Sequence, residues 1–213
     1  MSIRESIEKI RKTIPPDVAL VAATKTRAIE EIKEAIKAGI AIIGENYVQE
    51  AEKKLVLKSK VKFHCIGHLQ ANKIKKAVEI FDMIETVDSL KTAKEINQRC
   101  EAVSKIMPVL IEINIGKEPS KFGCMPKDAE TLAKEIKFLP NLELKGLMAM
   151  APFFDDPEKD RPYFKEMKKI FDNLKSRYNL EILSMGMSDS YRIAIQEGAN
   201  MVRIGKLIFG PRK

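Results

Sequence analysis

A regular alternation between short apolar runs and segments of helical spacing is the feature that most constrains the fold of this chain. The alternation repeats eight times along 213 residues, and most of the apolar runs lack the period-two pattern of half-exposed strands. Such runs are typical of parallel strands that are covered on both faces. The expected strands are residues 19–24, 41–44, 62–66, 83–86, 107–114, 144–150, 181–185 and 201–204.

Eight strand–helix units in a chain of this size predict an α/β fold, the (β/α)8 or TIM barrel, as a single domain over residues 1–213. An extra helix is expected before the first strand, at residues 3–12. The rival fold is a doubly wound open sheet. That fold would need a glycine-rich turn after the first strand, and residues 24–27 contain no glycine.

The cysteines and histidines indicate neither a disulfide framework nor a metal site. Cys65, Cys100 and Cys124 are odd in number and lack paired spacing, so we expect reduced thiols. The two histidines have no carboxylates at ligand spacing, and we expect no metal. No apolar run approaches the roughly 18 residues that a membrane span needs. We therefore expect a cytoplasmic protein without a membrane partner.

The net charge of +8 raises the alternative of a nucleic-acid-binding module. Lys73, Lys75 and Lys76 form the one tight basic cluster, and elsewhere lysines alternate with glutamates along the helical segments. Such mixing is typical of solvated helix surfaces. We expect no nucleic-acid partner, and a steep salt dependence of RNA binding would contradict this.

The position of one lysine indicates the chemistry. Lys25 directly follows the first expected strand, at the end of the barrel where active sites are built. Residues 184–188 and 202–205 lie at or just past the last two strands, the usual place for a phosphate in this fold. A lysine amine that faces a phosphate-binding pair of loops predicts a Schiff base with pyridoxal 5'-phosphate (PLP).

Two further residues carry expectations that the structure can test. Ser188 is expected to cap the helix that follows it and to present its hydroxyl to an anion. Arg203 is expected to point inward from the eighth strand, where a buried guanidinium needs an acceptor. Its acceptor is either an unprotonated pyridine nitrogen or a carboxylate, with Glu45 and Asp189 as the candidates.

Several motifs resemble those of the pyridoxal phosphate homeostasis proteins, the YggS/PROSC family, over residues 19–210. They are Gly44-Glu-Asn-Tyr-Val-Gln-Glu50, Phe63-His-Cys-Ile-Gly67, Leu69-Gln-Ala-Asn-Lys73, Gly146-Leu-Met148, Leu183-Ser-Met-Gly-Met-Ser-Asp189 and Met201-Val-Arg-Ile-Gly205. The family's Ser-Lys-Thr-Lys-Pro stretch reads Thr24-Lys-Thr-Arg-Ala28 here, and His68 stands where a proline is common. The chain thus departs from the family at the second lysine of that stretch, now Arg27.

The resemblance implies a fold-type III PLP barrel, like the N-terminal domain of alanine racemase. It assigns the Schiff base to Lys25 and the pyridine nitrogen to Arg203, and it places Asn46 near the ring. The phosphate would be held by Ser188, Gly205 and the backbone of Lys206.

The resemblance also implies a carrier that holds, supplies or buffers PLP in the cell without robust catalysis. PLP-dependent apo-enzymes are the expected protein partners, and we expect a monomer. The alternative activity is an alanine-type racemase, which needs a second base opposite the lysine. Alanine racemases bring a tyrosine from a C-terminal domain, and these 213 residues hold no such domain.

Overall fold

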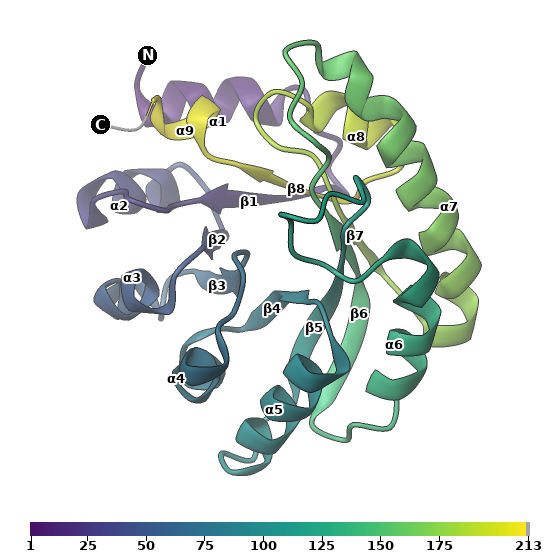
Figure 1. The fold of residues 1–213 in the computed structure, drawn as a ribbon. Helices are drawn as coiled ribbons and strands as arrows, with labels where there is room; N and C mark the ends of the chain where they lie inside the picture. Colours follow the sequence, from purple (N-terminus) through teal and green to yellow (C-terminus); the bar gives the residue numbers. More distant parts are fainter. Residues whose placement is uncertain (212–213) are drawn as a thin grey trace.

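A closed barrel of eight parallel strands organises the chain, in the order β1 to β8 with β8 returning to β1. The computed structural model describes residues 1–211 (Figure 1). The strands are β1 Ala19–Ala23, β2 Ile42–Glu45, β3 Lys62–Cys65, β4 Met83–Val87, β5 Met107–Ile113, β6 Leu142–Ala149, β7 Ile182–Ser184 and β8 Met201–Ile204. The TIM-barrel prediction is confirmed, and each expected strand forms within a few residues of its expected ends.

Helices cover the outside of the barrel. The α-helices are α1 Ile3–Arg11, α2 Ile29–Lys37, α3 Val48–Lys53, α4 Ile74–Ile80, α5 Leu90–Glu101, α6 Ala129–Ile136, α7 Arg161–Tyr178, α8 Tyr191–Gln196 and α9 Lys206–Phe209. Short 3-10 turns lie at η1 Leu55–Leu57, η2 Ala71–Lys73, η3 Pro126–Asp128 and η4 Pro157–Asp160. The first helix and the last one lie next to each other beside β1 and β8 (Figure 1).

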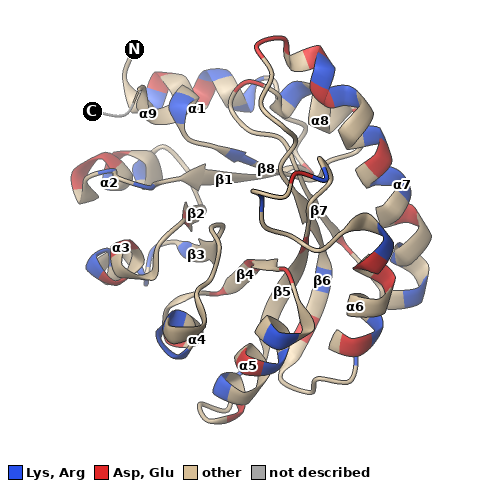
Figure 2. Cartoon of the chain, viewed as in Figure 1, with Lys and Arg blue, Asp and Glu red and all other residues tan. Residues whose placement is uncertain are grey.

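Local sequence signals explain where several helices begin and end. Ser2 and Glu5 form a reciprocal capping box at the start of α1, as their three-residue spacing allows. Gly39, with φ of 95°, follows the end of α2 in a conformation that favours glycine. Asn179 ends α7 in the left-handed region, which asparagine tolerates better than most residues. Acidic and basic residues alternate along the outer helices (Figure 2).

The main apolar core lies between the strands and the helices, while the barrel interior holds both apolar and polar side chains. Two small apolar clusters fill the interior, one around Val21, Ile66 and Met201 and one around Met83, Leu110 and Met148. The interior also holds five buried polar side chains: His64, Glu85, Glu112, Ser184 and Arg203. They lie beside the apolar clusters, since the register pairs Arg203 with Val21 and Ser184 with Met148.

Candidate functional site

A pocket of about 390 Å³ opens at the carboxyl end of the barrel, between the ends of β1, β2 and β8. It brings together four of the six predicted site residues: Lys25, Asn46, Gly205 and Lys206. Its other lining residues are Ala23, Arg27, Gly210 and Pro211. The chain order of these residues spans 189 positions, from 23 to 211, so the closure of the barrel creates this pocket.

Every second residue of β1, at positions 19, 21 and 23, points into the barrel. Lys25, just past the end of the strand, continues this alternation. Its side chain is half-buried, and its Nζ lies 3.4 Å from the Tyr47 hydroxyl and 4.7 Å from the centre of the Tyr47 ring. The tyrosine thus holds the lysine at the pocket by a hydrogen bond and a cation–π contact. This placement agrees with the sequence-based expectation of an amine at the barrel mouth.

Charged side chains hold the backbone on both sides of Lys25. Lys54 donates 2.8 Å to the carbonyl oxygen of Thr24 and 2.6 Å to Glu45, and the Thr24 hydroxyl also donates to Glu45. The amide of Thr26 donates 2.7 Å to Glu50. Thr26 has φ of 65°, an unfavourable conformation for a β-branched residue, so these bonds maintain a backbone that would otherwise relax. Sequence analysis missed this clamp.

Ser188 does not cap α8, which corrects that expectation. The residue before α8 is Ser190, and the Ser188 hydroxyl instead accepts a 3.4 Å hydrogen bond from the amide of Leu207 in α9. This bond ties the loop after β7 to the segment after β8. Gly205 approaches β1 closely, because a Cβ there would lie 3.1 Å from the Ala23 carbonyl oxygen. The three predicted phosphate-holding residues therefore lie on two joined loops.

Arg203 points into the barrel as expected and is 4% exposed. Its Nη1 donates 2.6 Å to the Ser184 hydroxyl and its Nη2 donates 2.9 Å to the carbonyl oxygen of Ala149. Neither Glu45 nor Asp189 is its partner, so those two alternatives are wrong; Glu45 is paired with Lys54 outside the barrel sheet. The two bonds leave further N–H groups of the guanidinium for another acceptor.

A buried hydrogen-bonded chain crosses the barrel beneath the pocket. His64 Nδ1 lies 2.7 Å from Glu85 Oε1, and Glu85 Oε2 accepts 2.7 Å from the same Ser184 hydroxyl that Arg203 contacts. Burial alone would raise the pKa of Glu85, but the bond from His64 and the charges of His64 and Arg203 hold it below its ordinary value. The signal that could have revealed Glu85 is a charged residue in the middle of an otherwise apolar strand.

Arg27 lines the pocket, but its guanidinium donates its hydrogen bonds to backbone carbonyl groups and so shapes the pocket wall. Its guanidinium donates to the carbonyl oxygens of Phe209, Gly210 and Pro211 and lies 3.6 Å from Glu31. It also lies over the Phe209 ring, 5.5 Å from its centre. The residue that replaces the second family lysine therefore fixes the segment after β8 as one wall of the pocket.

The cysteines show no sign of redox or metal chemistry. Burial raises the pKa of both Cys65 and Cys124 to about 12, so both thiols stay protonated and unreactive at neutral pH. Within residues 1–211, no group of three His, Cys, Asp or Glu side chains is arranged to hold a metal ion. In the same residues, no helix is long and apolar enough to cross a membrane.

Residues of the pocket and its surroundings fit an aldehyde-bearing phosphate ester, although Ser188 and Arg203 do not themselves line the pocket. Lys25 supplies a primary amine, Ser188 and the backbone around Gly205 supply hydrogen-bonding groups on joined loops, and Arg203 supplies a cation that cannot lose its proton. Asn46 reaches both this pocket and a neighbouring cavity near β3. An amine, an anion-binding loop pair and a permanent cation match the three functional groups of PLP.

Comparisons with known proteins show which sequences and folds this chain resembles. The alanine racemase N-terminal domain family matches residues 1–213. The pyridoxal phosphate homeostasis protein of Aquifex aeolicus is 40% identical over 198 residues, which cover 91% of this chain and 87% of that protein. The protein of the same name from Escherichia coli strain K12 is 39% identical over 204 residues, 93% of this chain and 87% of its own length.

Solved structures give the same picture. The structure of PipY from Synechococcus elongatus with PLP bound superimposes with a TM-score of 0.90, at 31% identity, over 98% of this chain and 100% of that one. Alanine racemase from Clostridium difficile superimposes with a TM-score of 0.85 over 99% of this chain and 59% of that one. At 16% identity the racemase supports the fold alone.

Proposed function

The chain belongs to the pyridoxal phosphate homeostasis protein family, and from this membership we propose that it binds PLP at the carboxyl end of its barrel, in intracellular PLP homeostasis. The single observation that carries the proposal is the position of Lys25. Its amine lies in the pocket that Asn46, Gly205 and Lys206 also line. We propose Lys25 as the residue that attaches PLP covalently, and residues 1–213 as one PLP-binding domain.

The loops after β7 and β8 hold the phosphate in this proposal. The Ser188 hydroxyl lies beside the Leu207 amide, and Gly205 and Lys206 line the pocket. The Ser188 oxygen accepts from the Leu207 amide, so its hydroxyl proton is left to donate a charge-assisted hydrogen bond to a phosphate oxygen. Asn46, from the opposite wall of the pocket, is proposed to contact the ring.

Arg203 sets the electronic character of the ring in this proposal. When bound, PLP supplies an aldehyde that an amine can attack and a ring that draws electrons strongly once its nitrogen is protonated. A guanidinium donates a hydrogen bond but does not give up its proton. The buried bonds from Arg203 to Ser184 and Ala149 fix its direction, so the residue keeps the pyridine nitrogen unprotonated.

The proposal is a carrier without robust catalysis, in preference to an alanine-type racemase. Two-sided proton transfer needs bases on opposite faces of the substrate carbon. The tyrosine beside Lys25 is Tyr47, whose hydroxyl lies 3.4 Å from the lysine amine and therefore shares its side. Racemase turnover on L-alanine separates the two activities.

We propose PLP-dependent apo-enzymes as the recipients of PLP, a monomer as the working form and the cytoplasm as the compartment. Cys65, Cys100 and Cys124 are free thiols, which supports a reducing compartment. The basic cluster at residues 73–76 supports no nucleic-acid role, because Lys76 pairs with Glu52 and Glu79.

The visible absorption spectrum of the purified protein tests the proposal. We expect an absorption band of bound PLP that free PLP in the same buffer does not show, and we expect borohydride to abolish it irreversibly. A protein that shows no such band after saturation with PLP would overturn the proposed function.

A further inference from the structure

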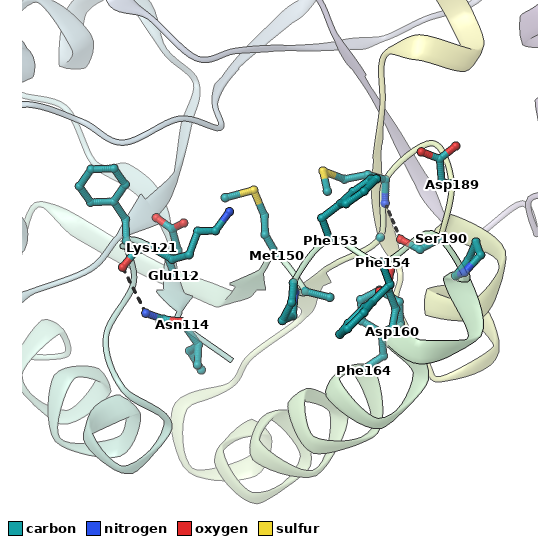
Figure 3. Close-up of a pocket in the computed structure, with 17 residues that line it drawn as sticks. Glu112, Asn114, Lys121, Met150, Phe153, Phe154, Asp160, Phe164, Asp189 and Ser190 are labelled. Carbon is teal, nitrogen blue, oxygen red and sulfur yellow. Dashed lines mark hydrogen bonds between the residues drawn. The ribbon is translucent and has the colours of Figure 1, made fainter. Parts of the chain in front are cut away.

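A second cavity lies across the barrel mouth from Lys25, between the loops after β5, β6 and β7 (Figure 3). It has a volume of about 150 Å³. Its walls are mainly apolar and aromatic, with Phe122, Met150, Phe153, Phe154 and Phe164 among them. None of the six residues proposed to hold PLP lines this cavity, although Met187 and Asp189, the neighbours of Ser188, do.

A buried carboxylate in this cavity lacks a hydrogen-bond partner. Glu112, on β5, is 3% exposed, and no donor in residues 1–211 lies within hydrogen-bonding distance of its Oε2. The charge of Arg203, on β8, acts on Glu112, but the guanidinium donates its hydrogen bonds to Ser184 and Ala149. An ionised carboxylate buried without a partner is unfavourable, so the site is incomplete as it stands.

A second buried carboxylate without a hydrogen-bond partner lies on the other side of the same cavity. Asp160, at the start of α7, is 8% exposed, and its Oδ1 has no partner among the described residues. Figure 3 shows the side chain of Met150 between Glu112 and Asp160 in this view. Burial raises the pKa of both carboxyl groups, that of Glu112 to about 7. This is expected for a buried acid that has no positively charged partner.

We propose that this cavity binds a small organic cation, a primary ammonium group on an apolar body, with Glu112 as the acceptor of its N–H groups and Asp160 as a second acceptor. Aromatic faces attract cations and shield them from water, and a buried carboxylate supplies a charge-assisted hydrogen bond. A neutral ligand of the same shape would fill the cavity and leave both carboxylates without a positively charged partner.

Two other occupants fit the cavity less well. An anion would meet two carboxylates, and a metal ion would need ligands that the cavity does not offer, since residues 1–211 contain no cluster of three acidic, His or Cys side chains for it. Lys121 lines the same cavity and is the intramolecular rival, although within residues 1–211 the Oε2 atom of Glu112 has no hydrogen-bond partner. Its side chain is exposed, so it would have to lose hydration to reach the acid.

The matched probes are phenethylamine and 2-phenylethanol, which share an apolar body and differ in the ammonium group. Isothermal titration calorimetry at pH 8, on the full chain freed of PLP, measures both dissociation constants. We expect the amine to bind at least about tenfold more tightly than the alcohol, the size of one hydrogen bond to a charged group. The PLP-free chain keeps this test independent of the proposed PLP function.

Substitutions decide whether Glu112 is responsible. Glu112→Gln should weaken phenethylamine at least about tenfold and leave the alcohol within about threefold, which shows that the cavity is intact. Glu143→Gln, at an exposed carboxylate of β6 remote from the cavity, should change neither constant, and Lys121→Met should preserve or strengthen amine binding. The proposal is overturned if the amine does not bind, if amine and alcohol bind equally, or if Glu112→Gln leaves the amine constant unchanged.

Discussion

The side-chain amine of Lys54 donates a 2.8 Å hydrogen bond to the carbonyl oxygen of Thr24, the residue directly before Lys25. The same amine lies 2.6 Å from Glu45, so one buried ion pair ties the end of β1 to the end of β2 and to α3. Burial raises the pKa of Glu45, and the bonds from Lys54 and Thr24 oppose that rise. The backbone that carries the proposed PLP lysine thus depends on charges that never enter the pocket.

Lys54→Met should weaken PLP at least about tenfold through loss of this backbone hydrogen bond, because the segment before Lys25 would no longer be fixed. Pyridoxine 5'-phosphate, which lacks the aldehyde, should keep its affinity within about threefold. A loss for PLP alone would show that Lys54 positions Lys25 and does not bind the ligand itself. Lys54→Arg should recover part of the PLP affinity. Equal losses for both ligands would contradict it.

A control is needed because the single substitution leaves Glu45 buried without its partner. Breaking one side of a buried ion pair costs about 3–5 kcal/mol of folding stability. The double variant Lys54→Met with Glu45→Gln removes both charges and should unfold at a higher urea concentration than Lys54→Met alone. The ligand comparison is then repeated on the double variant.

Ser188→Ala should weaken PLP retention without unfolding the barrel. A hydrogen bond from a hydroxyl to a charged phosphate contributes about 1.5–3 kcal/mol, which corresponds to a loss of about ten- to a hundredfold in affinity. Ser176→Ala, on the exposed face of α7, is the matched control. Unchanged PLP affinity with a lower melting temperature would show that the 3.4 Å contact with the Leu207 amide is the whole role of Ser188.

We predict that the PLP-bound protein removes the α-proton of amino acids very slowly, because Arg203 faces the ring nitrogen in the proposed site. A permanently charged guanidinium cannot protonate the pyridine nitrogen, so the ring withdraws electrons weakly. Proton NMR of L-alanine in heavy water measures the exchange at the α-carbon directly. Exchange as fast as in PLP enzymes would favour the racemase alternative.

We predict that the folding stability of the protein depends on pH through Glu112. Burial, with the charge of Asp88, raises its pKa from 4.5 to about 7. Between pH 4.5 and 7 the unfolded chain ionises this group while the folded chain keeps its proton, so folding stability falls as pH rises through that range. A rise of this size corresponds to about 3 kcal/mol in total.

Urea unfolding at pH 4.5, 6 and 8 checks this prediction. The stability of the natural chain minus that of Glu112→Gln should fall as pH rises, because glutamine does not titrate. A difference that stays constant across the three pH values would contradict the raised pKa.

The barrel could be predicted because it depends on local patterns. Apolar runs that are buried on both faces mark the strands, and the parity of β1 directs Lys25 toward the mouth. The partners of Glu85 could not be predicted, since His64 and Ser184 come from two other strands and meet it only when the barrel closes. Arg203, from a further strand, joins this chain through Ser184.

Ser188 shows the limit of local rules within the site. A serine shortly before a helix usually caps it, but the hydroxyl here accepts from the Leu207 amide, in the segment that follows the neighbouring strand β8. Lys54 was missed for a related reason. A lysine in a charged helical stretch normally faces solvent, and Lys54 becomes 5% exposed because Glu45 needs a buried partner.

Peptide mass mapping after borohydride reduction tests the central claim most directly. The protein is saturated with PLP, reduced, digested and sequenced by mass spectrometry, with Lys25→Ala as the control. The account predicts a phosphopyridoxyl group on Lys25 and its loss from that position's peptide in the variant. A reproducible label on Lys73 or Lys206 instead, with none on Lys25, would contradict it.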